Sequence, residues 1–568
     1  MNLFLNSLNN RNKIIGILIF VLPYILLRMW SNYYFSLIIF DDSFSYCVPT
    51  DMIDNGMLPA LNYRQIMYPL FIKVVLTVFK STNFIPLLHS IITFAISIVF
   101  LINLSKLITT KRFIIYAIGY SLAINSTYCI IAELSMLPDL LFFDSLIIIC
   151  TLFIRLIINP ENKITWLLLS IMFWISIGIK PIAIYYSLIY FGLIAFLLLK
   201  HYNKSILLCF ALPYVLLLTL NLGYSKYRGG SYSISSPSQG YQAFLGIAAS
   251  CIEPDKEHLP GFVNDRITPN ISQDKTNFNK IISSFNVDTI RKYFIADYTR
   301  CYSLVEDMNA STEVQSIVKN PNFNYAADFI LNKYESVLVS NAFAKSKTLF
   351  FKWFYYSFYT YVMKNNNFID PIDLTNINTR NNLKIKGEID YYNNVPLDLL
   401  PFGYYKDYYK YFQENKLATW HKYFGSYFPS NEEYQKYNQL NLIEKERYHF
   451  SSINASVNIQ EYFFAKTFYS LFHFLCYSIY GLRIPFVLGF IFLLNYLLDI
   501  ILLIKFKTLT NQKKLIFIFS TIALLNALFT CIAAPPIVRY SFPFQFIVYF
   551  SCVSFFAERF KKERSVLD

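Results

Sequence analysis

The chain has 568 residues, of which 55% are apolar and only 15% are charged. Water-soluble domains carry about 25% charged residues, so this composition argues against a soluble protein and favours a bilayer. The formal net charge of +14 does not indicate a nucleic-acid partner, because the surplus lies in short connections and the chain ends, while the central segment is nearly balanced.

Apolar windows along the chain predict about ten transmembrane helices, since the hydrocarbon core needs roughly 20 apolar residues per helix. The first window follows Arg11 and Lys13 and lacks a small-residue cleavage site, so we expect an uncleaved helix rather than a signal peptide. In chain order the windows are 14–40, 84–104, 113–132, 139–158, 165–179, 181–200, 205–222, 484–504, 515–533 and 541–557.

Clusters of Lys and Arg fall at every second predicted crossing, as the positive-inside rule requires. This pattern places both termini in the cytoplasm and the long central loop outside. We therefore expect an all-α polytopic membrane protein in three parts. They are a block of about seven helices at 1–222, an α-rich extracytoplasmic domain with interfacial helices at 223–483, and a block of three helices at 484–568.

Two features of the central loop leave alternatives open. The aromatic stretches 350–363 and 462–481 either lie at the outer interface or both span, which would place 364–459 in the cytoplasm. We favour interfacial helices. Cys251 and Cys301 are candidates for a disulfide if the compartment is oxidising.

The first outer loop, 41–83, carries the most informative polar residues. Asp41 and Asp42 stand together where the first apolar window ends, and Arg64 precedes Tyr68 by four residues. Ionisable groups at a membrane boundary are functional candidates by default. A carboxylate near apolar surface is a suitable proton acceptor, and an arginine fork matches phosphate oxygens. The alternative interpretation is a helix-terminal acidic pair with a snorkelling arginine.

Further polar residues are placed on the same membrane face by the predicted topology. Glu133 and Asp139 bracket Pro138 between two apolar windows, and Asp139 is also a reasonable helix-cap partner. Lys180 precedes the next outer turn, and Arg539 with Tyr540 precedes the last window. Four separate connections thus bring acids and bases to one surface.

The stretch DDSFSY followed by NGMLPALNYRQIMYPLF resembles the first outer loop of the GT-C membrane glycosyltransferases. It is most similar to the branch that holds protein O-mannosyltransferases and lipid A aminoarabinose transferases. AELSMLPDLL is similar to that family's second outer connection, and VRYSFP resembles its Arg-Tyr-x-x-Pro element. The resemblance covers roughly 14–200 and 484–558, and the central loop resembles no family.

The resemblance implies a glycosyltransferase that moves a sugar from a polyprenyl-phosphate donor to a glycolipid, polysaccharide or protein acceptor. The reaction would take place on the outer, periplasmic face of a bacterial inner membrane and build a cell-envelope glycan. Asp41 or Asp42 would be the base, while Arg64, Arg539 and Lys180 would hold the donor phosphate. Tyr68, Glu133, Asp139 and Tyr540 would complete the substrate site.

Because arginine and lysine can neutralise a monophosphate, we expect no required cofactor, although these acids could ligate a divalent metal. The alternatives are a polysaccharide polymerase or ligase, and a flippase or transporter of lipid-linked sugars. Transport is less consistent with charges at one face and with the lack of an internal repeat.

Overall fold

The computed structural model describes residues 11–34, 37–57, 65–229, 484–506, 509–533 and 544–567, with scattered positions between 351 and 439. Regular structure in these residues is helical, apart from one isolated β-bridge. The N-terminal helices and 3-10 turns are α2 (Arg11–Tyr34), α3 (Asp41–Asp54), α4 (Met67–Phe79), η1 (Thr82–Phe84), α5 (Ile85–Leu107), α6 (Thr110–Ile124), α7 (Thr127–Leu134), α8 (Asp139–Ile158), α9 (Lys163–Ile179), η2 (Pro181–Tyr185), α10 (Tyr186–Leu199) and α11 (Lys204–Gly229). The C-terminal helices are α25 (Ile484–Phe506), α26 (Asn511–Ala533) and α27 (Gln545–Leu567).

Seven of these helices are long and apolar enough to cross a membrane. Each coincides with one of the ten predicted windows, which supports an all-α membrane protein. The three remaining windows, 113–132, 165–179 and 541–557, fall on helices whose apolar parts are shorter. The structure therefore supports seven candidate spans, and the larger number stays a prediction.

Two predicted windows have the wrong boundaries. The first was expected to continue to residue 40, but α2 ends at Tyr34, and residues 37–40 are not helical and include the β-bridge at Ile38. The window 113–132 was expected to be one helix, but it divides at Asn125 into α6 and α7. Ser126 begins the second helix, where its side chain accepts a hydrogen bond from the Cys129 backbone N–H.

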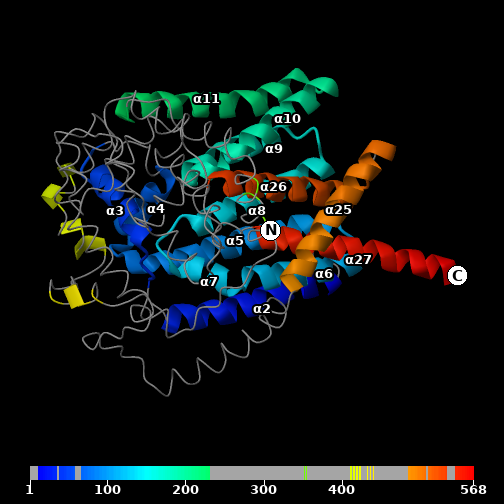
Figure 1. Cartoon of the computed structure of the whole chain (residues 1–568), viewed down its shortest axis with the longest axis horizontal. Helices are drawn as coiled ribbons and strands as arrows, with labels where there is room; N and C mark the ends of the chain where they lie inside the picture. Colours follow the sequence, from blue (N-terminus) through cyan, green and yellow to red (C-terminus); the bar gives the residue numbers. More distant parts are fainter. Residues whose placement is uncertain are drawn as a thin grey trace, which may run out of the picture.

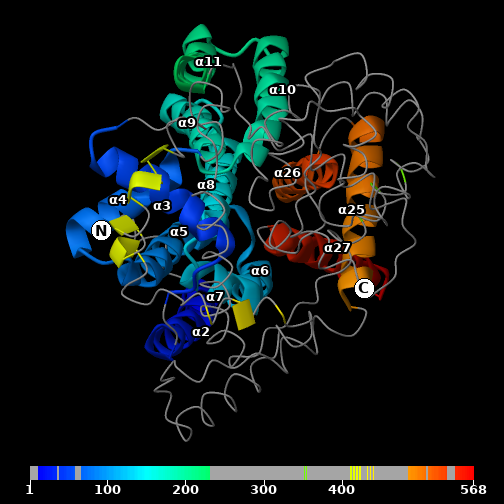
Figure 2. The same cartoon turned by 60° about the vertical axis from the view of Figure 1, so that its left-hand side comes forward.

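Most of the long helices run side by side along the long axis of the molecule, with α3 and α4 at one end and the C-terminal end of α27 at the other (Figure 1). Helix α2 packs on α6, α5 on α8, α9 on α11 and α27 on α6. Turning the molecule shows the orange and red C-terminal helices on the opposite side of α8 from the blue α2 and α4 (Figure 2). We call the end that carries α3 the α3 end.

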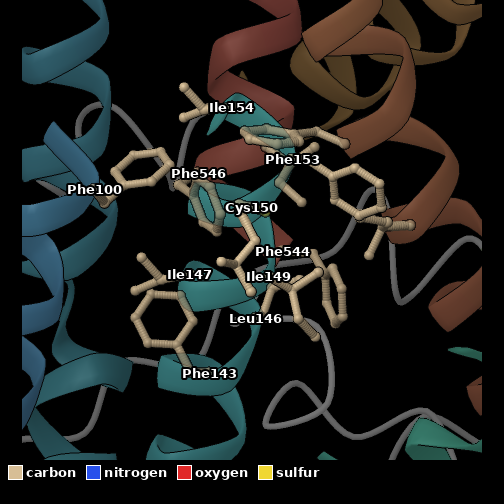
Figure 3. Packing of buried hydrophobic residues seen from close by; sticks show 14 of the residues in the cluster. Phe100, Phe143, Leu146, Ile147, Ile149, Cys150, Phe153, Ile154, Phe544 and Phe546 are labelled. Atoms are coloured by element: carbon tan, nitrogen blue, oxygen red, sulfur yellow. The ribbon is translucent and has the colours of Figure 1, made fainter. Parts of the chain in front are cut away.

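Aromatic side chains pack the C-terminal helices against the N-terminal helices, although the long central segment separates the two blocks in sequence. Phe546 of α27 meets Phe100 of α5 and Phe143 of α8 edge to face, at 5.9 and 6.1 Å between ring centroids (Figure 3). Such pairs each contribute about 0.5–1.5 kcal/mol beyond burial. In a bilayer this close packing is what holds helices together, because lipid is as apolar as the core.

Candidate functional site

A short backbone bridge fixes the path from α2 to α3. The Ile38 N–H donates to the Leu134 carbonyl at 2.8 Å, and the Met136 N–H donates to the Ile38 carbonyl at 2.9 Å. Ile38 is also buried against Ile130, which lies on α7. The bridge therefore attaches the chain just before α3 to the connection just before α8.

Helix α3 begins three residues after this bridge, at the acidic pair. The Phe40 N–H donates to the Ser43 hydroxyl at 2.9 Å, which fixes the first turn. Asp41 and Asp42 are the first two residues of α3. They open a new helix instead of ending the membrane helix, and carboxylates are favourable partners of a helix N-terminus. Their side chains lie outside the described residues.

Asp139 and Lys180 meet at the same end of the bundle. The Lys180 Nζ donates to the Asp139 Oδ1 at 2.5 Å, and the two side chains are only 11% and 5% exposed. Asp139 starts α8 four residues after Ser135 of the bridge, while Lys180 directly follows α9. The predicted topology puts both residues on the same membrane face, and in the structure they form an ion pair.

Glu133 belongs to a closed network with a residue that sequence reasoning missed. Arg28 of α2 binds both Glu133 carboxylate oxygens, at 2.6 and 2.7 Å. Tyr24 and Ser90 also donate hydrogen bonds to this carboxylate. The single signal for Arg28 is its position as an arginine inside an apolar window. A substrate contact by Glu133 stays a prediction, because this carboxylate is already occupied.

Arg28 also completes the end of α6. Its guanidinium donates to the Ile124 carbonyl and to the Asn125 side-chain oxygen, both at 2.7 Å. Carbonyls at a helix C-terminus have no partner within the helix, so a cation there is stabilising. The same arginine thus stabilises the break between α6 and α7. It also binds Glu133, which lies two residues before Ser135 of the bridge.

Tyr68 is fully buried, and its hydroxyl has no hydrogen-bond partner within the described part of the chain. Its ring contacts Tyr46 of α3 edge to face, at 5.1 Å between centroids. Helices α3 and α4 pack on each other, so Tyr68 lies under the helix that starts with the acidic pair. A buried hydroxyl without a partner is uncommon and is a candidate contact for a ligand.

Arg64, Arg539 and Tyr540 lie outside the described residues, as do Cys251, Cys301 and most of the two aromatic stretches. The flanks of the connection 534–543 are described. Phe529 of α26 contacts Tyr185 of η2, and Phe546 of α27 contacts Phe143 of α8. These contacts bring both ends of that connection close to elements that follow Lys180 and Asp139.

The buried cations named so far are already paired. Arg28 and Lys180 are buried cations, and each is paired with a carboxylate. The positive charge for a donor phosphate would therefore come from Arg64 and Arg539. No group of three or more His, Cys, Asp or Glu side chains suited to a metal ion occurs in the parts of the chain described above. Independence from metals stays a prediction.

No protein-family model, curated protein or solved structure matches this chain. The assignment of an activity therefore depends on the motifs and on the geometry of the α3 end. That geometry offers carboxylates at a helix start, a buried Asp–Lys pair and a buried phenol beside the predicted membrane boundary. The carboxylates are suited to proton transfer, and the phenol and the paired lysine are suited to hydrogen-bonding a substrate hydroxyl or oxygen.

Proposed function

We propose that this chain is a membrane glycosyltransferase that takes a sugar from a polyprenyl-phosphate donor and transfers it to an acceptor hydroxyl outside the cytoplasm. The observation that carries the proposal is the backbone bridge between Ile38 and Ser135. It supports a common site, because it ties the chain three residues before α3 to the chain four residues before α8. The acidic pair and the Asp139–Lys180 pair begin or border these helices.

The proposed reaction is a single displacement at the anomeric carbon. The acceptor oxygen forms the new bond to this carbon as the bond to the phosphate oxygen breaks. Asp41 or Asp42 takes the acceptor proton, and the polyprenyl phosphate leaves with the bonding electron pair. Arg64 and Arg539 stabilise the charge that grows on this phosphate.

In this proposal Lys180 orients the donor by a hydrogen bond and does not supply its counter-charge. Its charge is neutralised by Asp139, so it can offer a hydrogen bond to the donor without adding net charge to the site. Tyr68 offers a second buried donor from α4. Together these groups would orient the substrate, while the two arginines supply the positive charge.

A transfer assay tests the proposal. Purified protein in lipid vesicles receives a polyprenyl-phosphate sugar with a labelled sugar and a mixed pool of envelope acceptors. We expect label on an acceptor together with one released polyprenyl phosphate for each sugar transferred, both detected by mass spectrometry. Intact donor without either product would contradict transfer chemistry.

Transport of a lipid-linked sugar has one observation in its favour. Asp144 of α8 is buried, its Oδ2 accepts a hydrogen bond from Thr93, and its Oδ1 has no partner in the described residues. Buried carboxylates inside membrane helices are typical of transport pathways. Movement of intact donor between the leaflets, lost in Asp144→Asn, would favour this second function.

A further inference from the structure

A buried carboxylate on α3 is held by residues from the distant central segment. Asp51 is only 6% exposed. It accepts hydrogen bonds from the Tyr411 hydroxyl at 2.7 Å, the Thr419 hydroxyl at 2.9 Å and the Lys422 Nζ at 2.5 Å. Three donors from one short stretch satisfy a single carboxylate, which is a built contact and not a chance surface pairing.

The same stretch contacts the rest of the first outer loop. Lys422 also binds Asp54 at 2.7 Å, and the Asn55 side chain donates to the Tyr411 hydroxyl at 2.6 Å. Thr82 donates to the Tyr423 carbonyl at 2.9 Å. The contacts therefore extend over α3, the turn that follows it and the turn after α4.

The donors share one side of a helical stretch. The described positions from 410 to 423 are helical. Positions 411, 419 and 422 are separated by eight and three residues, close to whole turns of a helix, which places them on one helix face. Tyr411 and Thr419 are buried on that face, whereas Lys410 is exposed.

The electrostatics of Lys422 favour its pairing with Asp51 and Asp54. Partial burial alone would lower the pKa of its ammonium group, but the hydrogen bonds and charges of Asp51 and Asp54 outweigh this and raise the pKa. The contribution of a raised lysine pKa to stability is present below the ordinary value of 10.5 and is lost as pH rises through the folded-state value. Deprotonation of Lys422 therefore does not break the contact within the physiological pH range.

We propose that Tyr411, Thr419 and Lys422 form a clamp on α3, in which Lys422 is a positioning residue for the acidic pair. Asp51 lies ten residues after Asp41, about 15 Å along the helix at 1.5 Å per residue, so Lys422 acts through α3 and not on the reacting atoms. The kinetic part of this inference rests on the proposed glycosyltransferase function. The clamp itself does not.

The clamp has a consequence for topology that is independent of the reaction. A segment that binds Asp51 and Asp54 lies on the same side of the membrane as α3. The alternative in which 350–363 and 462–481 both span, leaving 364–459 on the opposite side, is incompatible with it. The central segment therefore returns to the face that carries the candidate site.

The native Cys47 provides a test that needs no activity. This thiol is fully buried in α3, and burial raises its pKa, so its reaction with maleimide is slow until α3 loosens. In protein that retains only Cys47, Lys422→Gln should speed labelling at least about tenfold over Lys410→Gln, whereas Lys422→Arg should stay slow. Equal labelling in the Lys422→Gln and Lys410→Gln proteins would overturn the clamp.

Sidedness is measured with single cysteines introduced into cysteine-free protein. An impermeant maleimide should label Lys410→Cys from the same side as Met57→Cys, which follows α3, and from the opposite side to Glu161→Cys, between α8 and α9. Labelling of positions 410 and 161 from one side would overturn the inference, whatever the activity of the protein.

Kinetics separate a positioning role from a substrate contact. Lys422→Gln should lower kcat about tenfold with the donor KM changed less than twofold, and Lys422→Arg should recover most of the loss. A native kcat in a Lys422→Gln protein whose Cys47 labels rapidly would overturn the positioning role. If wild-type protein transfers no sugar, the proposed function fails, and Cys47 labelling still decides the clamp.

Discussion

Arg28 of α2 and Glu133 of α7 form a bidentate ion pair. The Arg28 Nε donates to Glu133 Oε2 at 2.6 Å, and the Arg28 Nη2 donates to Glu133 Oε1 at 2.7 Å. Both residues are nearly inaccessible to solvent. Glu133 lies two residues before Ser135, which forms the backbone bridge with Ile38 that precedes α3 and α8. The ion pair is therefore part of the support of the candidate site, and it gives the first test of the structure.

Removing one partner of this pair should be strongly destabilising. Arg28→Met or Glu133→Gln leaves a buried charge or dipole without its partner, at a cost of about 3–5 kcal/mol. The double variant should recover part of this loss, because neither charge remains. Thermal unfolding in detergent measures the effect, with the exposed Lys163→Gln as the control. Single variants within 1 kcal/mol of wild type would contradict the pair.

Tyr68→Phe should separate a role in stability from a role in binding. The buried hydroxyl makes no hydrogen bond in the described residues, so its removal should change the free energy of unfolding by less than about 1 kcal/mol. If this hydroxyl binds substrate, kcat/KM should fall about tenfold. Tyr24→Phe is the matched control, since the Tyr24 hydroxyl bonds to Ser90 and Glu133 and its loss should lower stability. Loss of stability without loss of activity in Tyr68→Phe would exclude the binding role.

Asp139→Asn and Lys180→Gln should have different effects on the donor KM. The first variant removes the carboxylate that neutralises Lys180, so the lysine charge becomes available to the donor phosphate, and the donor KM should fall or stay the same. The second leaves an unpaired carboxylate and should raise the donor KM about ten- to a hundredfold, as expected for a charge-assisted contact of 1.5–3 kcal/mol. Steady-state kinetics on purified protein provide the measurement. An equal rise of the donor KM in both variants would indicate a purely structural pair.

Arg64→Ala and Arg539→Ala should weaken donor use much more than Lys200→Ala. The expected rise in the donor KM is about ten- to a hundredfold for each arginine, since each is assigned to the donor phosphate. Lys200 follows α10 at the other end of that helix from Lys180. Equal donor KM values in all three variants would show that the donor phosphate does not bind at Arg64 and Arg539.

Apolar length was sufficient to predict the helical architecture, because each window must satisfy its backbone within the segment. It was insufficient for helix ends. Residues 35–40 are as apolar as the helix before them, and the chain becomes extended at Ile38 because of hydrogen bonds to α7 and to the connection that follows it. The break at Asn125 had a local signal in the Asn-Ser pair, which favours turns and caps.

Polar positions in the site were predictable one by one, but their partners were not. A carboxylate at a membrane boundary marks a candidate from sequence alone. Nothing local connects Glu133 to Arg28, 105 positions away, or Asp51 to Lys422, 371 positions away. These contacts depend on tertiary packing, which hydropathy and spacing do not encode.

The acidic pair at the start of α3 is the central element of the proposed function. Asp41→Asn and Asp42→Asn keep size and most hydrogen bonding but remove a proton acceptor. Loss of a general base costs about 10²–10⁴ in rate, so one variant should fall that far, with Asp41 favoured, and the other should fall less. Glu161→Gln, at an exposed turn between α8 and α9, should remain native.

Single-turnover sugar transfer by these purified variants in lipid is the most direct measurement. We expect a drop of at least about a hundredfold in the transfer rate of one Asn variant, with donor binding preserved and the Glu161→Gln rate unchanged. Near-native transfer rates in both Asn variants would show that the pair only begins a helix, and would contradict the proposed function.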